Sequence, residues 1–106
     1  MVNNTKIIWS DRAKYDLKNI YEYYYDLSPL TAKSLIGGIL KRIHLLKRGF
    51  VWIGQKEPLL TKTKFEYRYL IYRNYKIIYR TENKIIKIIT IYDTRQNPTK
   101  LSNFTE

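Results

Sequence analysis

The sequence contains no cysteine, and this absence excludes a disulfide-stapled scaffold and any metal site built on thiolates. Its one histidine, His44, falls in the middle of an expected helix, where we expect it at the helix surface or at the edge of the core. Neither a cluster of metal ligands, nor a Ser-His-Asp set, nor a glycine-rich phosphate loop can be found, so we expect no metal and no cofactor. Apolar runs long enough for a signal peptide or a membrane-spanning helix are also missing, which predicts a cytoplasmic protein.

Acidic residues are few compared with basic ones. Nine Asp and Glu stand against 20 Lys and Arg, which gives a net charge of +11. So large an excess disfavours a compact state through self-repulsion, and such an excess usually meets an anionic partner. Nucleic acid, an acidic protein and a membrane surface are the candidate partners. The length of 106 residues and the apolar content of 44% suit one domain over residues 1–106 with one modest core.

The first half of the chain predicts a short strand and two helices. The apolar run 6–9 is typical of a strand, Ser10 is a helix N-cap, and Ser28-Pro29 starts a second helix that ends near Gly49. So short a turn between helices predicts an antiparallel helical hairpin. Apolar residues recur at steps of four and three on one face of each helix: Ala13, Leu17, Ile20, Tyr24 and Leu27, then Ala32, Ile36, Ile39, Ile43 and Leu46.

Two adjacent glycines, Gly37 and Gly38, lie inside the second expected helix. Each costs roughly 1 kcal/mol relative to alanine in a helix interior. We therefore expect either the first helix or the sheet to approach closely at this point, or the helix to be weak there.

The second half of the chain predicts strands. A loop is expected over 50–64, then two strands over 67–72 and 75–80 around an Arg73-Asn74 turn in which Asn74 tolerates a positive φ. A second turn at 82–84 leads into 85–92, which is apolar on both faces as in a central strand. The predicted order is β-α-α-β-β-β. It describes an α+β domain with an N-terminal strand and a helical hairpin packed on a small, mainly antiparallel sheet.

The Arg73-Asn74 turn predicts a register that separates two faces of the strand pair. One face is assigned to the core and holds the pairs Tyr72–Tyr75, Leu70–Ile77 and Arg68–Tyr79. The opposite face interleaves tyrosines with cations: Tyr67, Tyr69 and Ile71 opposite Arg80, Ile78 and Lys76.

Cations and aromatic rings on one surface are suited to phosphates and unpaired bases. The opposite face is therefore a candidate site for binding nucleic acid or another target. Lys62 and Lys64 lead into this hairpin, and Arg95 leaves the next strand. In the alternative interpretation Tyr67 and Tyr69 only build the sheet, because tyrosine favours strands, and Arg95 either caps carbonyls at the end of the sheet or pairs with Asp93.

These residues together resemble the RelE/ParE superfamily, the toxins of bacterial type II toxin–antitoxin (plasmid stabilization) systems. The resemblance covers nearly the whole chain, in the order of the family. It begins at Ile8-Trp9-Ser10 with Ala13, Asp16-Leu17, Ile20 and Tyr23, and continues through Ser28, Ala32 and Ile43 to Leu46. It is strongest in Tyr67-Arg68-Tyr69-Leu70, Asn74-Tyr75-Lys76-Ile77-Ile78-Tyr79 and Asp93-Thr94-Arg95-Gln96-Asn97-Pro98.

The resemblance implies a small basic toxin that a cognate acidic antitoxin neutralises. RelE-like members cut mRNA in the ribosome, whereas ParE-like members inhibit DNA gyrase and need no catalytic residues of their own. Lys76 and Arg95 stand at positions where the nucleases carry catalytic arginines, and Lys62 and Lys64 loosely match lysines of the nucleases. The nucleases' C-terminal Tyr or His falls near Leu101, where the nearby aromatic residue is Phe104, and neither side chain can transfer a proton.

The sequence therefore predicts a ParE-like toxin that arrests growth by inhibiting gyrase and is not an enzyme. The first alternative is a metal-independent, ribosome-dependent mRNA endoribonuclease that uses Lys76 and Arg95. The second alternative is a non-toxic basic RNA-binding module.

Overall fold

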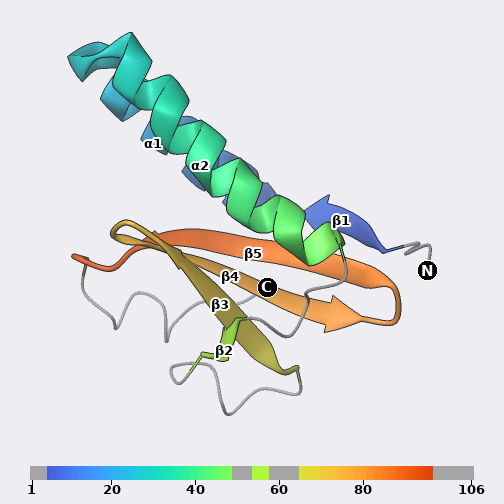
Figure 1. Cartoon of the computed structure of the whole chain (residues 1–106). Helices are drawn as coiled ribbons and strands as arrows, with labels where there is room; N and C mark the ends of the chain where they lie inside the picture. The colour runs from blue at the N-terminus through green and yellow to red at the C-terminus, as the bar shows by residue number, and fades with distance from the viewer. Residues whose placement is uncertain (1–4, 49–53, 58–64, 97–106) are drawn as a thin grey trace.

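The computed structural model describes residues 5–48, 54–57 and 65–96 (Figure 1). Its elements are β1 (Lys6–Trp9), α1 (Asp11–Leu27), α2 (Pro29–Lys47), β2 (Gln55–Lys56), β3 (Tyr67–Tyr72), β4 (Tyr75–Glu82) and β5 (Ile85–Asp93). The predicted order is confirmed, with one addition, since the two-residue strand β2 lies in the segment expected to be a loop. Neither helix of the described part is long and apolar enough to cross a membrane.

The five strands form one sheet in the order β1-β5-β4-β3-β2. Strand β1 runs parallel to β5, and the other neighbours are antiparallel, so the sheet is mainly antiparallel as predicted. Strand β5 is an interior strand, paired with β1 on one side and β4 on the other, as its apolar sequence predicts. A bulge interrupts the β4–β5 pairing, because Ile78 pairs with Thr90 while Tyr79 pairs with Ile88, and Ile89 has no partner in β4.

Both helices begin at the predicted caps. The Ser10 hydroxyl oxygen accepts a hydrogen bond from the Ala13 amide at 3.0 Å, and the Ser28 hydroxyl oxygen accepts one from the Thr31 amide at 3.3 Å. These bonds satisfy amides that the first turn of a helix leaves without a partner. The helical hairpin lies across one face of the sheet, and its tip projects beyond the sheet (Figure 1).

The main core lies between this hairpin and the sheet. Most of the predicted apolar positions are buried there or pack against its edge. Leu27 was expected on the buried face, yet it is 68% exposed because it belongs to the tip of the hairpin. Leu35 was not predicted and is only 2% exposed, since the apolar stripe of α2 is wider than one line of residues.

The predicted hairpin register is confirmed, from Tyr72–Tyr75 to Tyr67–Arg80. The turn differs in one detail, because Arg73 and not Asn74 has the positive φ, of 55°. The side-chain amide of Asn74 instead donates a hydrogen bond to the Asp93 carboxylate, at the end of β5, at 3.2 Å. This contact between distant segments is invisible to a local turn preference.

The close approach expected at the glycine pair is found at one of the two positions. A Cβ on Gly38 would overlap the Tyr72 ring of β3, whereas a Cβ on Gly37 would meet open space. The sheet therefore explains Gly38, and packing does not explain Gly37.

Candidate functional site

The outer face of the sheet, turned away from the helices, holds Lys76 next to Glu57. The Lys76 ammonium lies 2.9 Å from the Glu57 carboxylate and 4.4 Å from the centre of the Tyr69 ring. The Glu57 side chain is fully buried and the Lys76 side chain is 19% exposed. A buried carboxylate needs such a cation, because removing either partner leaves an uncompensated charge. Lys76 is thus held in place by an internal ion pair.

Arg80 and the tyrosines of this face are also committed to internal contacts. The Arg80 guanidinium lies 3.9 Å from the centre of the Phe65 ring, and its side chain is 10% exposed. Tyr67 is buried in a second small core with Ile78 and Ile89. The Tyr69 hydroxyl donates to the Gln55 side-chain oxygen at 3.1 Å.

Tyr67 and Arg80, which are 7% and 9% exposed, are therefore largely buried on this face. Glu57 and Phe65, from the stretches before β3, pack against this face, and strand periodicity carries no sign of them. Lys62 and Lys64, together with Leu101 and Phe104, lie outside the described residues.

Arg95 lies beyond the end of β5 and pairs with Asp93. Its guanidinium nitrogens lie 2.8 and 3.1 Å from the two carboxylate oxygens of Asp93. The hydrogen bond from the Arg95 side chain is the main reason why the pKa of Asp93 falls to about 2, against a partial opposing effect of burial. The Arg95 amide and the Asn74 side chain also donate to this carboxylate and lower its pKa further.

Lys76 and Arg95 are not brought together. Asp93, which holds Arg95, pairs with Tyr75, and Tyr75 belongs to the core on the helix side of the sheet. Lys76 follows Tyr75 in β4 and therefore points to the opposite face. The two candidate catalytic cations thus lie on opposite sides of the sheet, each bound to a carboxylate.

A groove of about 480 Å³ lies between α1 and the end of β5. Tyr75, which also lines the groove, is buried, and burial together with a hydrogen bond to Tyr24 raises its pKa above the ordinary range. Two arginines, Arg12 and Arg95, line the groove with the exposed rings of Tyr15 and Tyr23. Each arginine is paired with an aspartate, Arg12 with Asp16 and Arg95 with Asp93.

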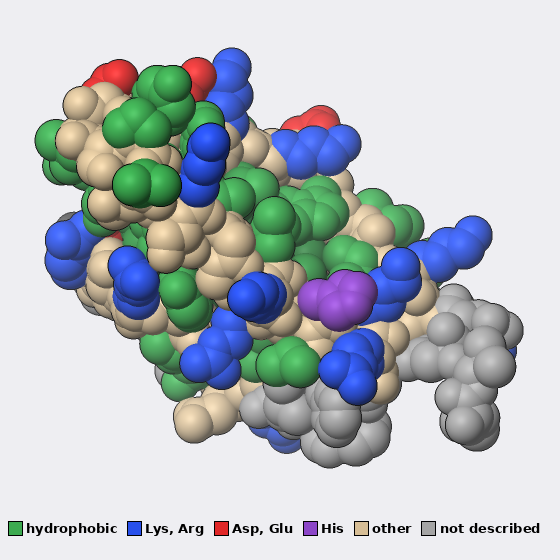
Figure 2. Space-filling model, turned by 45° about the horizontal axis from the view of Figure 1, so that its top comes forward, with side chains coloured by type: hydrophobic (Ala, Val, Ile, Leu, Met, Phe, Trp, Pro, Cys, Tyr) green, Lys and Arg blue, Asp and Glu red, His purple; other side chains and the backbone are tan. Residues whose placement is uncertain are grey.

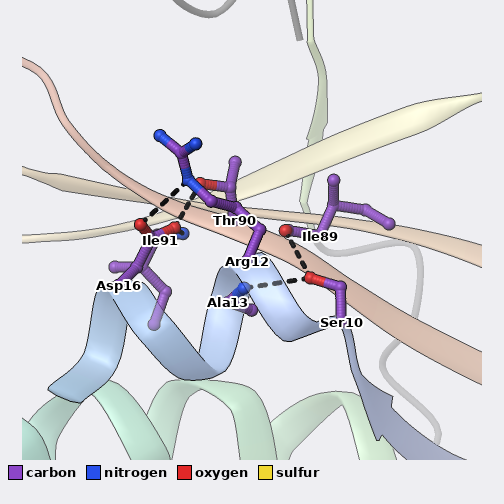
Figure 3. Close-up of polar contacts among 7 residues, drawn as sticks. All are labelled: Ser10, Arg12, Ala13, Asp16, Ile89, Thr90 and Ile91. Atoms are coloured by element: carbon purple, nitrogen blue, oxygen red, sulfur yellow. Dashed lines mark hydrogen bonds and ion pairs between the residues drawn. The ribbon is translucent and has the colours of Figure 1, made fainter. Parts of the chain in front are cut away.

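Asp16 in this groove is a residue that the sequence analysis did not single out as a candidate site residue. Its carboxylate accepts hydrogen bonds from the Thr90 hydroxyl and, at 3.0 Å, from the Ile91 amide, and it pairs with Arg12 at 3.1 Å (Figure 3). The Ser10 hydroxyl donates to the Ile89 carbonyl at 2.7 Å on the same strand. Asp16 and Ser10 therefore fasten α1 to β5 next to the bulge. The available signal was position, because Asp16 lies one turn after the buried Ala13.

Among the described residues, no three His, Asp or Glu side chains come close enough to hold a metal ion.

Comparisons with known proteins support one family. The model of the family described as the ParE toxin of type II toxin-antitoxin system, parDE, matches residues 7–98. A solved structure described as the chromosomal ParDE TA system from P. aeruginosa contains a similar chain. That chain superposes with a TM-score of 0.69 at 23% identity, over 87% of this chain and 98% of the other. This likeness shows a shared fold. No curated protein sequence matches the chain.

Proposed function

Because this chain belongs to the ParE toxin family of type II toxin–antitoxin systems, we propose that it arrests bacterial growth by inhibiting DNA gyrase. We propose further that residues 1–106 act as one toxin domain and that a cognate acidic antitoxin neutralises it. The charge of +11 supports an acidic partner.

One observation favours gyrase inhibition over RNA cleavage. Cleaving a phosphodiester requires cations that converge where negative charge develops, together with groups that move protons. Lys76 and Arg95 lie on opposite faces of the sheet, and each is bound to a carboxylate within 2.9 Å. In the described part of the chain these two cations therefore cannot act on the same phosphate. Inhibition by binding is the simpler mechanism.

The test uses purified protein in two assays. We expect the protein to inhibit supercoiling by gyrase and to leave mRNA intact in a translation extract. Codon-linked cuts in the extract, reduced far more by Arg95→Ala than by Lys14→Ala, would establish the nuclease instead. Lys14 is the matched control because it is an exposed cation on α1.

A growth assay separates both toxins from the non-toxic RNA-binding alternative. Inducing the chain alone should arrest bacterial growth, and co-expressing the antitoxin should restore it. Normal growth despite confirmed soluble expression of the chain would contradict the proposal.

A further inference from the structure

The two helices differ sharply in charge. Helix α1 carries three cations, Arg12, Lys14 and Lys18, against four acids, Asp11, Asp16, Glu22 and Asp26. Helix α2 carries cations at Lys33, Lys41, Arg42 and Lys47 and contains no Asp or Glu. The positive charge of the helical layer is therefore concentrated on α2. Figure 2 shows Lys and Arg side chains around the one histidine, His44 of α2, while acidic side chains lie mainly at the upper edge of the view.

Three of these cations, Lys33, Lys41 and Arg42, border a groove of about 630 Å³ between α2 and the end of β3. Lys33, Gly37 and Lys41 follow one another on successive turns, so the two lysines lie about 12 Å apart along the helix axis. Gly37 has no side chain to fill the space between them, and a Cβ there would still meet nothing within 4 Å. Tyr72 lines the groove, and Arg73 lies over its ring with 5.4 Å to the ring centre. We call Lys33, Gly37, Lys41, Arg42 and Arg73 the α2 basic face.

The cations of the α2 basic face are exposed, and none has an acidic partner within 5–48, 54–57 and 65–96. They differ in this from Lys76 and Arg95, which are bound to Glu57 and Asp93. Exposed cations that repel one another and have no acid nearby are available to an external anion. A row of phosphates fits a row of cations along a helix.

We propose that the α2 basic face binds the phosphate backbone of duplex DNA. The choice of DNA rests on the proposed function, because a gyrase inhibitor meets an enzyme that holds duplex DNA. A duplex suits this face better than a single strand does, since single strands are held by exposed aromatic rings on which bases stack. The aromatic ring that lines the groove, Tyr72, is half-buried and already in contact with Arg73.

The experiment measures binding of the full chain to a fluorescently labelled DNA duplex of arbitrary sequence, by anisotropy, over a range of salt concentrations. The test variant is Lys41→Glu with Arg42→Glu. The matched control is Lys14→Glu with Lys18→Glu, which changes the net charge equally at exposed positions of α1. We expect the test variant to raise Kd by about tenfold or more and to flatten the salt dependence by about two phosphate contacts. We expect the control to change Kd by less than about threefold.

An equal loss in both variants would overturn the inference, because net charge alone would then explain binding. No loss in the test variant would overturn it as well, and so would duplex RNA of the same sequence binding about tenfold tighter than DNA. Circular dichroism checks the fold, and the neutral pair Lys41→Gln with Arg42→Gln replaces the test variant if charge reversal unfolds it. Its loss of DNA affinity should again exceed that of the control.

Failure of the inference and failure of the proposed function give different results. The DNA assay contains no gyrase, so a chain that binds DNA through the α2 basic face yet leaves supercoiling unaffected refutes only the proposed function. A chain that inhibits supercoiling while its test variant binds DNA as tightly as the control refutes only the inference.

Discussion

Asp16 shows how much of this fold depends on one carboxylate. It lies on α1, is 12% exposed, and accepts hydrogen bonds from two donors on β5, the Thr90 hydroxyl and the Ile91 amide. The bulge in β5 precedes these donors, and bulges commonly redirect neighbouring groups. The family pattern that includes Trp9-Ser10, Ala13 and Asp16-Leu17 therefore has a structural explanation, since two of these residues join the helix to the strand.

Replacing Asp16 by alanine should lower the free energy of unfolding by about 1–3 kcal/mol, because the two donors, on the buried residues Thr90 and Ile91, lose their acceptor. Urea unfolding followed by circular dichroism measures the effect. Glu22→Ala is the control, since it removes the same charge from an exposed position of α1, and it should change stability by less than about 0.5 kcal/mol. Equal effects of the two substitutions would show that Asp16 does not hold α1 to β5.

The Asp93 carboxylate should make the stability of the fold depend on pH. Its hydrogen bonds, first that from the Arg95 side chain, lower its pKa from 3.8 to about 2 in the folded chain. A lowered pKa means that the carboxylate stabilises the fold above pH 3.8 and that this contribution is lost as the pH falls towards 2. Asp93→Asn should therefore be less stable than the original chain at neutral pH, and the difference should shrink in acid. Urea unfolding at a series of pH values tests this, and a constant difference would contradict it.

The two adjacent glycines inside helix α2 should respond differently to replacement by alanine. Gly37→Ala should raise the free energy of unfolding by about 1 kcal/mol, because the new methyl group meets open space and alanine favours helices. Gly38→Ala should be less stable than Gly37→Ala, because its methyl group must displace the Tyr72 ring.

Thermal or urea unfolding of both variants gives the comparison. A double-mutant cycle with Tyr72→Ala isolates the contact, and the penalty at Gly38 should disappear when the ring is absent. If both alanines have the same effect in the original chain, the close approach of β3 to α2 is not significant for stability.

The sequence predicted best those features of the fold that depend on residues close together in the chain. The serine caps of α1 and α2, the β3–β4 register and the interior place of β5 all follow from residues near one another in the chain. The cover of the sheet's outer face was not predicted because it comes from elsewhere, with Glu57 bound to Lys76 and Phe65 stacked on Arg80. Periodicity within a strand states which residues share a face, and it cannot state what packs against that face.

The candidate site was predictable only in part, for the same reason. The pairing of Arg95 with Asp93 was one of three sequence interpretations, and it joins residues only two positions apart. The bonds from Thr90 and Ile91 to Asp16 span 74 and 75 residues. The position of Asp16 one turn after Ala13 places it near the sheet, but it does not indicate these partners.

For the whole molecule, the net charge predicts how an antitoxin binds. The rate of association with an acidic antitoxin should fall steeply as salt is added, because exposed charges are screened beyond about 8 Å at physiological ionic strength. The dissociation rate should change much less, because buried apolar contacts determine most of it. Stopped-flow measurements at several salt concentrations test this. An association rate that is independent of salt would show that the charge of +11 does not serve to capture the antitoxin.

The parallel pairing of β1 with β5 has a consequence for synthesis in the cell. Strand β1 is made first, yet its partner and the acceptor of the Ser10 hydroxyl, the Ile89 carbonyl, follow 79 residues later along the chain. At bacterial rates of translation this interval is on the order of 4 to 16 seconds. The helical hairpin is made before β3, β4 and β5, so its apolar stripes are exposed until these strands follow. The core between the hairpin and the sheet is therefore completed only after β5 has been made.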